Sequence, residues 1–306
     1  MSPNTSAVQE LNKGPDGAPA GERPPRPGGA LPVERLASVD GVLNYFKPSA
    51  EKPRTYTYNP PPPGQPMSTV VSEPHTVAIH DARPVLGRVS LDREGFDLIR
   101  FETSVANFDD DDTVTAVYYP EVERAVKEAT GADRVFIFDH TIRRHIPGTK
   151  DDRVGPRQPV PRIHVDHTVK SGPQRVHELL PDEADELLRG RVQIINLWRP
   201  IRGPVLDFPL AICDAASVRF DDLVAAEHIY RHRVGETYQV LYNPAHRWFY
   251  VPEMRTDEAL LLKCFDTRTD GAARFAPHTA FVDPTTPAGA PPRESIEVRT
   301  LVFHRA

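Results

Sequence analysis

Short apolar runs separated by Pro, Gly and Asp dominate the chain from about residue 134 onward. Runs of this kind, bounded by turn residues, are typical of β-strands, and many of them in succession indicate a sandwich or a barrel. The expected strands are VFIF (135–138), RIHV (162–165), VQIINLW (192–198), TYQVLY (237–242), WFYV (248–251), LLLKCF (260–265), HTAFV (278–282) and SIEVRTLVF (295–303).

The front half of the chain carries mixed patterns. Apolar residues recur at helical spacing over 114–126, directly after the acidic run 109–112, whose carboxylates suit the positive end of a helix. Because Pro120 interrupts this pattern, we expect two helical pieces that meet at a kink. Residues 91–105 place their apolar side chains near helical spacing, whereas the alternation around residues 77–82 predicts a strand.

Three further segments complete the organisation. Residues 1–33 are rich in Pro and Gly with few large apolar side chains, so we expect a flexible tail. The run NPPPPGQP (59–66) predicts a stiff, extended surface segment, and residues 182–188 favour a helix. The sequence therefore predicts one domain over 34–306. Its fold class is mainly β with helices, a double-stranded β-helix (jelly roll, cupin-like) core backed by α-helices.

Composition narrows the class of protein. The 306 residues are 39 % hydrophobic and 26 % charged, with a net charge of −6 and no basic patch of the kind that nucleic acid or anionic lipid requires. Polar residues interrupt each apolar stretch well before the roughly 20 residues needed to cross a bilayer. Cys213 and Cys264 lie in apolar contexts that predict buried free thiols, which fits a reducing cytoplasm. We expect a cytoplasmic protein without a nucleic-acid or membrane partner, with homo-oligomerisation left open.

The clearest chemical motif is the sequence RIHVDHT at 162–168. Residues two apart on a strand point to the same face, so His164 and Asp166 can approach one metal ion together. His167, which lies beside them, points the other way on a regular strand and is expected to act indirectly. An H-x-D sequence alone is weak evidence, because such a pair on a strand is commonly only hydrogen-bonded.

The C-terminal strands add the groups that make this motif informative. His278 opens an apolar strand, and after a Pro/Gly-rich turn Arg293 and Ser295 share one face of the last strand. Two histidines and one carboxylate form the facial triad that leaves open positions on iron(II). A planar guanidinium nearby suits bidentate capture of a carboxylate.

Taken with these motifs, the chain resembles the iron(II)/2-oxoglutarate oxygenases. The resemblance is to the hydroxylase/desaturase family related to the cephem methoxylase chains of antibiotic producers, which also includes fungal tailoring oxygenases. It covers roughly residues 55–304. The strings that carry it are FDHTIRRH (138–145), RIHVDHT, INLWRP (195–200), YNPAHRWFY (242–250), APHTAFVDP and PRESIEVR.

The resemblance implies that His164, Asp166 and His278 hold Fe(II) and that Arg293 with Ser295 anchors 2-oxoglutarate, with O2 as the other co-substrate. It also implies hydroxylation or desaturation of a small molecule in specialised metabolism, such as antibiotic biosynthesis. Because Asp166 occupies the position that a halogenase leaves for chloride, halogenation is disfavoured.

Several assignments stay open at this stage. Arg299 has the same strand parity as Arg293 and is an alternative anchor, and His246 is an alternative third ligand. His140, Arg143 and Trp198 are candidate substrate-contacting residues, while Tyr242 is a candidate hydrogen-bond donor to 2-oxoglutarate. The rival functions are a metal hydrolase on the same His/Asp/His site and a non-catalytic cupin-like protein.

Overall fold

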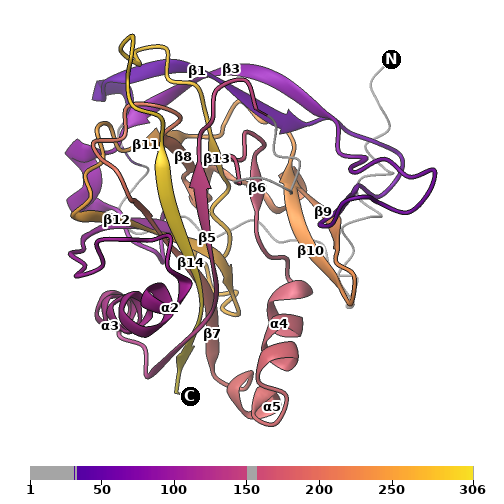
Figure 1. Ribbon diagram of the computed structural model, residues 1–306. Helices are drawn as coiled ribbons and strands as arrows, with labels where there is room; N and C mark the ends of the chain where they lie inside the picture. Colours follow the sequence, from indigo (N-terminus) through magenta and orange to yellow (C-terminus); the bar gives the residue numbers. More distant parts are fainter. Residues whose placement is uncertain (1–30, 32, 150–156, 306) are drawn as a thin grey trace.

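The computed structural model describes residues 31, 33–149 and 157–305 of the chain. The predicted tail at 1–33 therefore lies almost entirely outside the described residues. Two curled sheets and a few helices make up the fold, with α3 covering the outer face of the smaller sheet (Figure 1). The mainly β architecture with supporting helices agrees with the predicted fold class.

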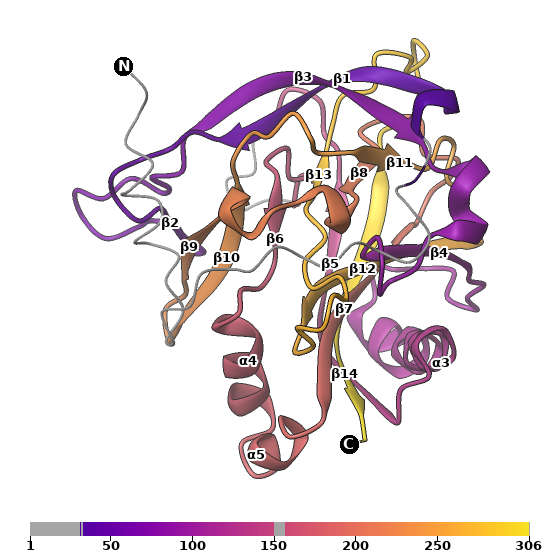
Figure 2. The same cartoon turned by 180° about the vertical axis from the view of Figure 1, so that it is seen from behind.

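The larger sheet has nine strands in the order β1-β3-β11-β8-β13-β6-β10-β9-β2. Its described pairs are antiparallel except for β11 with β3 and β2 with β9. The antiparallel pair of β1 and β3 spans one end of the molecule, as both views show (Figure 2). The strands are β1 (Ser38–Phe46), β2 (Arg54–Tyr56), β3 (Ser72–Asp81), β6 (His164–Val165), β8 (Leu210–Cys213), β9 (Leu223–Ile229), β10 (Val234–Val240), β11 (Trp248–Tyr250) and β13 (His278–Ala280).

The smaller sheet has five antiparallel strands in the order β4-β12-β7-β14-β5. The strands are β4 (Phe96–Arg100), β5 (Arg134–Arg144), β7 (Arg191–Pro200), β12 (Glu258–Asp266) and β14 (Glu294–His304). The helices are α2 (Asp111–Thr113), a π-helical turn (Val114–Tyr118), α3 (Tyr119–Thr130), α4 (Ser171–Leu179) and α5 (Ala184–Leu187). Short 3-10 turns occupy Val33–Arg35, Arg83–Arg88, Ala215–Ser217 and Phe220–Asp222.

Alternation of side chains along β7 and β14 separates the two faces of the smaller sheet. Ile195 and Leu197 of β7 and Ile296 and Val298 of β14 belong to the apolar cluster that packs under α3. The residues between them point the other way, toward the larger sheet. Because both faces are covered, β7 is buried along almost its whole length.

The helical prediction over 114–126 is confirmed. Asp110 caps the first turn by accepting a hydrogen bond from the backbone N–H of Asp112. Pro120 lies at the start of α3, directly after a π-helical turn that ends at Tyr118. A π-helical turn, rather than a break, joins the two pieces.

The helical expectation around residues 96–99 is wrong. These residues form β4, an edge strand that pairs with β12. Phe96 and Leu98 alternate toward one face, and a run this short fits either period. Both cysteines are buried free thiols, as predicted.

Candidate active site

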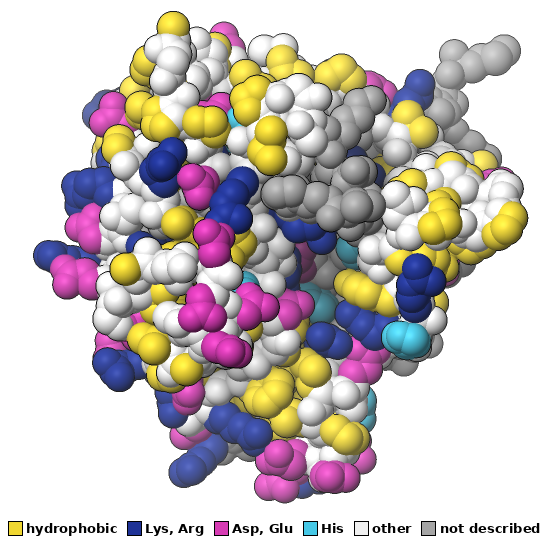
Figure 3. Space-filling view, viewed as in Figure 1, with side chains coloured by type: hydrophobic (Ala, Val, Ile, Leu, Met, Phe, Trp, Pro, Cys, Tyr) yellow, Lys and Arg dark blue, Asp and Glu magenta, His cyan; other side chains and the backbone are white. Residues whose placement is uncertain are grey.

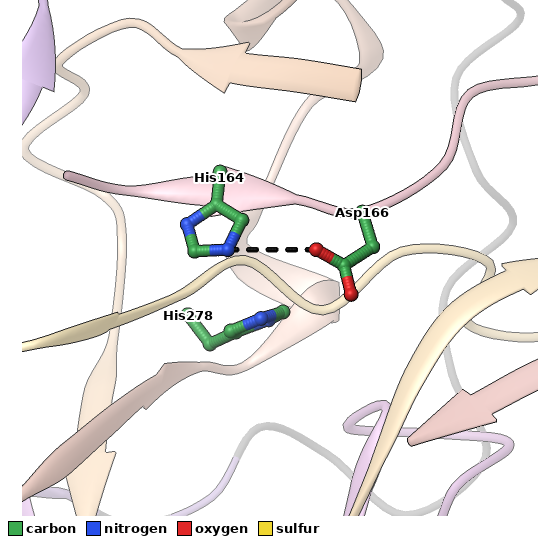
Figure 4. A group of neighbouring side chains, drawn as sticks. All are labelled: His164, Asp166 and His278. Atoms are coloured by element: carbon green, nitrogen blue, oxygen red, sulfur yellow. Dashed lines mark ion pairs between the residues drawn. The ribbon is translucent and has the colours of Figure 1, made fainter. Parts of the chain in front are cut away.

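Three candidate metal ligands come together between the two sheets. His164 and His278 are direct cross-strand partners on β6 and β13, and Asp166 follows β6 on the same side as His164. Their ligand atoms all lie within 4.8 Å of one another, and the three side chains converge (Figure 4). The third candidate ligand in this group is therefore His278.

Hydrogen bonds orient each imidazole toward the shared point. His164 Nδ1 lies 2.8 Å from the carbonyl oxygen of Arg162, and His278 Nδ1 lies 3.1 Å from that of Ala276. A proton on each Nδ1 can be donated to these carbonyls, which leaves each Nε2 lone pair free to bind a metal. Burial lowers the pKa of His164 to about 3, so its ring is neutral near pH 7.

Hydrogen bonds hold the Asp166 carboxylate through one of its two oxygens. Its Oδ2 accepts hydrogen bonds from Asn196 Nδ2 at 2.8 Å and from Arg299 Nε at 2.9 Å. Its Oδ1 lies 3.5 Å from His164 Nε2 and faces the other two ligands. Burial is the largest single influence and works against the charged form, but the neighbouring groups, Arg299 foremost, together outweigh it and hold the pKa of Asp166 well below its usual range. The residues thus offer two imidazoles and one carboxylate, the donor set of a facial triad.

Arg299 is fully engaged with these carboxylates. Besides Asp166, its Nη1 donates to Asp139 at 3.0 Å and its Nη2 to Glu297 at 2.6 Å. Glu297 in turn accepts a hydrogen bond from Asn196 at 3.0 Å. Strand parity therefore predicted that Arg299 lies on the same face of β14 as Arg293. In the structure, however, Arg299 supports the ligand carboxylate of Asp166.

Arg293 has a different environment on the same strand. The residue is 3 % exposed, and its guanidinium lies 5.0 Å from the ring centre of Trp198 and donates from Nε to Ser295 Oγ at 3.2 Å. Its Nη1 donates to the carbonyl oxygen of Phe208 at 2.6 Å. Nη2 makes no hydrogen bond, and no ion pair forms on this guanidinium, within 33–149 and 157–305. Burial lowers the pKa of Arg293 to about 9, a value that still leaves it charged at neutral pH.

A strained turn helps to position Arg293. Phe208 has φ of 45°, a left-handed conformation that a bulky residue rarely adopts. The turn directs the Phe208 carbonyl at the guanidinium, and Asp207 accepts the backbone N–H of Arg293 at 3.2 Å. Asp207 also pairs with His145, whose ring packs 4.2 Å from that of Phe208. No motif in the sequence singles out this support.

Three adjoining cavities surround these groups. The smallest, about 20 Å³, is lined by both candidate histidine ligands together with Arg293, Trp198 and Leu210. A second cavity of about 110 Å³ is lined by His164 and Asp166. The third and largest of them, about 320 Å³, is lined by Asp166 and His167 and reaches the surface. Basic, acidic and imidazole groups gather in a hollow in the middle of the face drawn in Figure 3.

The remaining candidates take different positions. Arg143 lines all three cavities. His140 points to the other face of β5, where Tyr119 and Asp111 contact it. Tyr242 is 43 % exposed and its ring stacks 3.8 Å from that of His75.

The alternative ligand His246 lies in a separate cluster. It is enclosed between Asp222, 3.1 Å away, and Tyr45, 3.3 Å away. Neither His246, His140 nor Tyr242 is among the described residues that line the three cavities.

Comparison with known proteins agrees with this site. The family described as an oxidoreductase/YMDC permease-like domain matches residues 43–303. The chain is 34 % identical over 273 residues to the Fe(II)/2-oxoglutarate-dependent dioxygenase nvfI of Aspergillus novofumigatus, covering 86 % of this chain and 96 % of that protein. It is 35 % identical over 288 residues to the hydroxylase/desaturase efuI of Hormonema carpetanum, covering 87 % and 95 %.

A solved structure extends the likeness to the fold. The iron and alpha-ketoglutarate-dependent endoperoxidase NvfI superimposes with a TM-score of 0.79 at 30 % identity, covering 89 % of this chain and 100 % of that one. The chain therefore belongs to the Fe(II)/2-oxoglutarate-dependent oxygenases. Within them it is a member of the group that contains the hydroxylase/desaturases, and it is an enzyme that acts on a small molecule. This confirms the predicted jelly-roll fold, the enzyme class and the need for Fe(II) and 2-oxoglutarate. The hydrolase and non-catalytic alternatives find no support among these relatives. The described part of the chain contains no helix that is long and apolar enough to cross a membrane.

Proposed function

We propose that His164, Asp166 and His278 bind the catalytic Fe(II) of this oxygenase. The observation that carries the proposal is the convergence of their ligand atoms within 4.8 Å. Each is also held by hydrogen bonds on the side away from the common point. Supporting groups of this kind fix the tautomer and orientation of metal ligands. A facial set of three protein ligands leaves positions open for the co-substrate and O2.

We propose Arg293 as the anchor for the far carboxylate of 2-oxoglutarate. It lines the same small cavity as His164 and His278, and its Nη2 atom remains available within the described residues. The unused hydrogens of Nη1 and Nη2 offer a fork that matches a carboxylate. Ser295 Oγ and the Phe208 carbonyl set the plane of this fork. We do not propose Arg299, because Asp166, Asp139 and Glu297 already engage it.

Bound iron and 2-oxoglutarate supply the oxidising power, since O2 is reduced while 2-oxoglutarate becomes succinate and CO2 and one C–H bond of the substrate is oxidised. The chain positions that C–H bond and restricts water. Trp198 and Leu210 form an apolar wall of the 20 Å³ cavity, where we propose that 2-oxoglutarate binds. We propose that the organic substrate enters the 320 Å³ cavity, whose wall includes Asp166. A substrate held there would present its reactive carbon from the side of Asp166.

We propose hydroxylation or desaturation in natural-product metabolism as the physiological reaction. The names of the relatives support this, including hydroxylase/desaturase efuI and aspirochlorine biosynthesis protein N of Aspergillus oryzae. We further propose that the enzyme works in the cytoplasm, which the two buried free thiols favour.

Anaerobic addition of Fe(II) and 2-oxoglutarate, followed by visible spectroscopy, tests the site. The wild type is expected to show a metal-to-ligand charge-transfer band. His278→Ala is expected to lose the band, Arg293→Met to need far more 2-oxoglutarate, and the control His246→Ala to keep the wild-type response. A band that survives His278→Ala but disappears in His246→Ala would refute the ligand assignment.

A further inference from the structure

Arg143 lies between the 20 Å³ cavity, where we propose that 2-oxoglutarate binds, and the 320 Å³ cavity, where we propose that the substrate binds. It is on β5, directly across from Ser295 of β14, and its side chain points to the inner face of the sheet. It lines the 20 Å³ cavity with Arg293 and His164, and it also lines the 110 Å³ and 320 Å³ cavities. A group bound at Arg143 can therefore belong either to the co-substrate or to the substrate.

Its polar contacts leave most of the guanidinium unused. Nη1 donates to the carbonyl oxygen of Gln158 at 2.9 Å. Nε and Nη2 make no hydrogen bond, and no carboxylate forms an ion pair with Arg143, among the residues that the structure describes. The acid with the largest effect on it, Glu297, already binds Asn196 and Arg299.

Three other arginines that line the 320 Å³ cavity, in contrast, have carboxylate partners. Arg175 lies 3.1 Å and Arg233 lies 3.5 Å from Glu178, and Arg299 is surrounded by three carboxylates. Burial lowers the pKa of Arg143 to about 10, so it remains a cation whose charge is poorly solvated. Such a cation is costly unless an anion accompanies it.

We propose that Arg143 is a second carboxylate-binding residue of the active site. Its free edge presents parallel N–H donors, the geometry that carboxylates match. The carboxylate has two possible sources. One is the carboxylate at the 2-oxo acid end of 2-oxoglutarate, and the other is a carboxylate on the organic substrate in the cleft. The first source rests on the proposed function, in which Arg293 holds the opposite end of 2-oxoglutarate.

The test compares Arg143→Gln, Arg143→Lys and a matched control, Arg144→Gln. Arg144 is the next residue on β5 and binds Glu294 and Asp109 outside the three cavities. The first measurement is the affinity for 2-oxoglutarate from the charge-transfer band of the anaerobic Fe(II) protein. The second is equilibrium dialysis of 2-naphthoate and of the uncharged 2-naphthamide against the Fe(II) protein saturated with 2-oxoglutarate.

Loss of one charge-assisted contact corresponds to roughly a ten- to hundred-fold change in affinity. If the 2-oxo acid end is the ligand, Arg143→Gln weakens 2-oxoglutarate by this factor. If the substrate supplies the carboxylate, Arg143→Gln keeps the wild-type affinity for 2-oxoglutarate but loses the preference for 2-naphthoate over 2-naphthamide. Arg143→Lys, which keeps the charge but not the fork, is expected to fall between wild type and Arg143→Gln.

Unchanged 2-oxoglutarate affinity together with unchanged discrimination between the two probes would overturn the proposal. So would an equal effect of Arg144→Gln, because that residue has no access to the cavities. Failure of the proposed function gives a different result, the absence of the band in the wild type. Circular dichroism melts of each variant establish that the binding differences arise in folded protein.

Discussion

Arg293 and Arg299 share one face of β14, yet exchanging each for methionine is expected to have opposite consequences. Arg299 compensates Asp166, Asp139 and Glu297. Arg293 is more deeply buried than Arg299 but has only a hydroxyl and a carbonyl as partners within the described residues. The first arginine therefore stabilises the site itself, and the second is arranged for a ligand.

The magnitudes follow from these contacts. Arg299→Met leaves buried carboxylates uncompensated, which costs about 3–5 kcal/mol of unfolding free energy. Arg293→Met loses two hydrogen bonds of about 1 kcal/mol each but also removes a poorly solvated charge. These effects oppose one another, so the unfolding free energy of the ligand-free protein is expected to stay within about 1 kcal/mol of wild type.

The stabilisation by 2-oxoglutarate is then expected to be much smaller for Arg293→Met than for the wild type. At a concentration of about 100 times Kd, the ligand stabilises the metal-loaded wild type by about 2.7 kcal/mol. If loss of the anchor weakens binding about 100-fold, the same concentration stabilises Arg293→Met by only about 0.4 kcal/mol.

Urea unfolding of the metal-loaded proteins, with and without 2-oxoglutarate under anaerobic conditions, measures both quantities. Each variant serves as the control for the other, because both replace a buried guanidinium of β14 with the same side chain. The reasoning is refuted if Arg293→Met retains the full stabilisation by 2-oxoglutarate. It is equally refuted if Arg299→Met unfolds at the wild-type urea concentration.

Further outcomes are expected at the metal ligands. Asn196→Ala removes an amide that holds Asp166 and should weaken Fe(II) binding roughly ten-fold or more by calorimetry, whereas unchanged affinity would mean that other groups orient the carboxylate. Burial lowers the pKa of His164 to about 3 and of His167 to about 4, below the unfolded value of about 6.5. The unfolded chain therefore binds more protons between about pH 4 and 6.5, and the metal-free protein should lose stability as pH falls through this window, by up to about 2.7 kcal/mol per pH unit. Urea melts at pH 7 and 5.5 measure this loss, and a flat profile would contradict it. Chelation with EDTA should lower the Tm of the wild type but not of His278→Ala, and equal shifts in both would argue against ligation by His278.

Strand periodicity was enough to predict much of the fold and of the site's arrangement. The alternation that makes 162–165 a strand also places His164 and Asp166 on one side, and the structure brings them together. The same rule puts Arg293, Ser295 and Arg299 on one face of the last strand. Side-chain direction has a fixed period of two, so it can be predicted wherever the strand itself is recognised.

Pairing between distant strands could not be predicted in this way. Parity leaves Arg293 and Arg299 equivalent, and only the neighbours from β5 and β7 distinguish them. Asp139 reaches Arg299 because the two residues are direct cross-strand partners on β5 and β14. A sequence without an alignment does not reveal which strands will be adjacent.

Some elements were also missed or misjudged. The strands β8 and β9 and the helix α4 were not predicted, and β4 was expected to be helical. β8 has only four residues, all buried, so that periodicity cannot identify it. The first helical turn of α4 contains Gly and Pro, and packing of Val176 in the core outweighs this weak intrinsic propensity.

Charged side chains of both signs face the ligand set, among them Asp166, Glu297, Arg143, Arg293 and Arg299. Fe(II) alone adds two positive charges and 2-oxoglutarate alone adds two negative ones, whereas both together add no net charge. In a poorly solvated site this favours joint occupancy, and each ligand must strengthen the other by the same factor. Direct chelation produces coupling as well, but charge balance extends it to a dicarboxylate that lacks the 2-oxo group. Glutarate should therefore bind more tightly to the metal-loaded protein than to the metal-free protein, and equal affinities would leave chelation as the sole source of coupling.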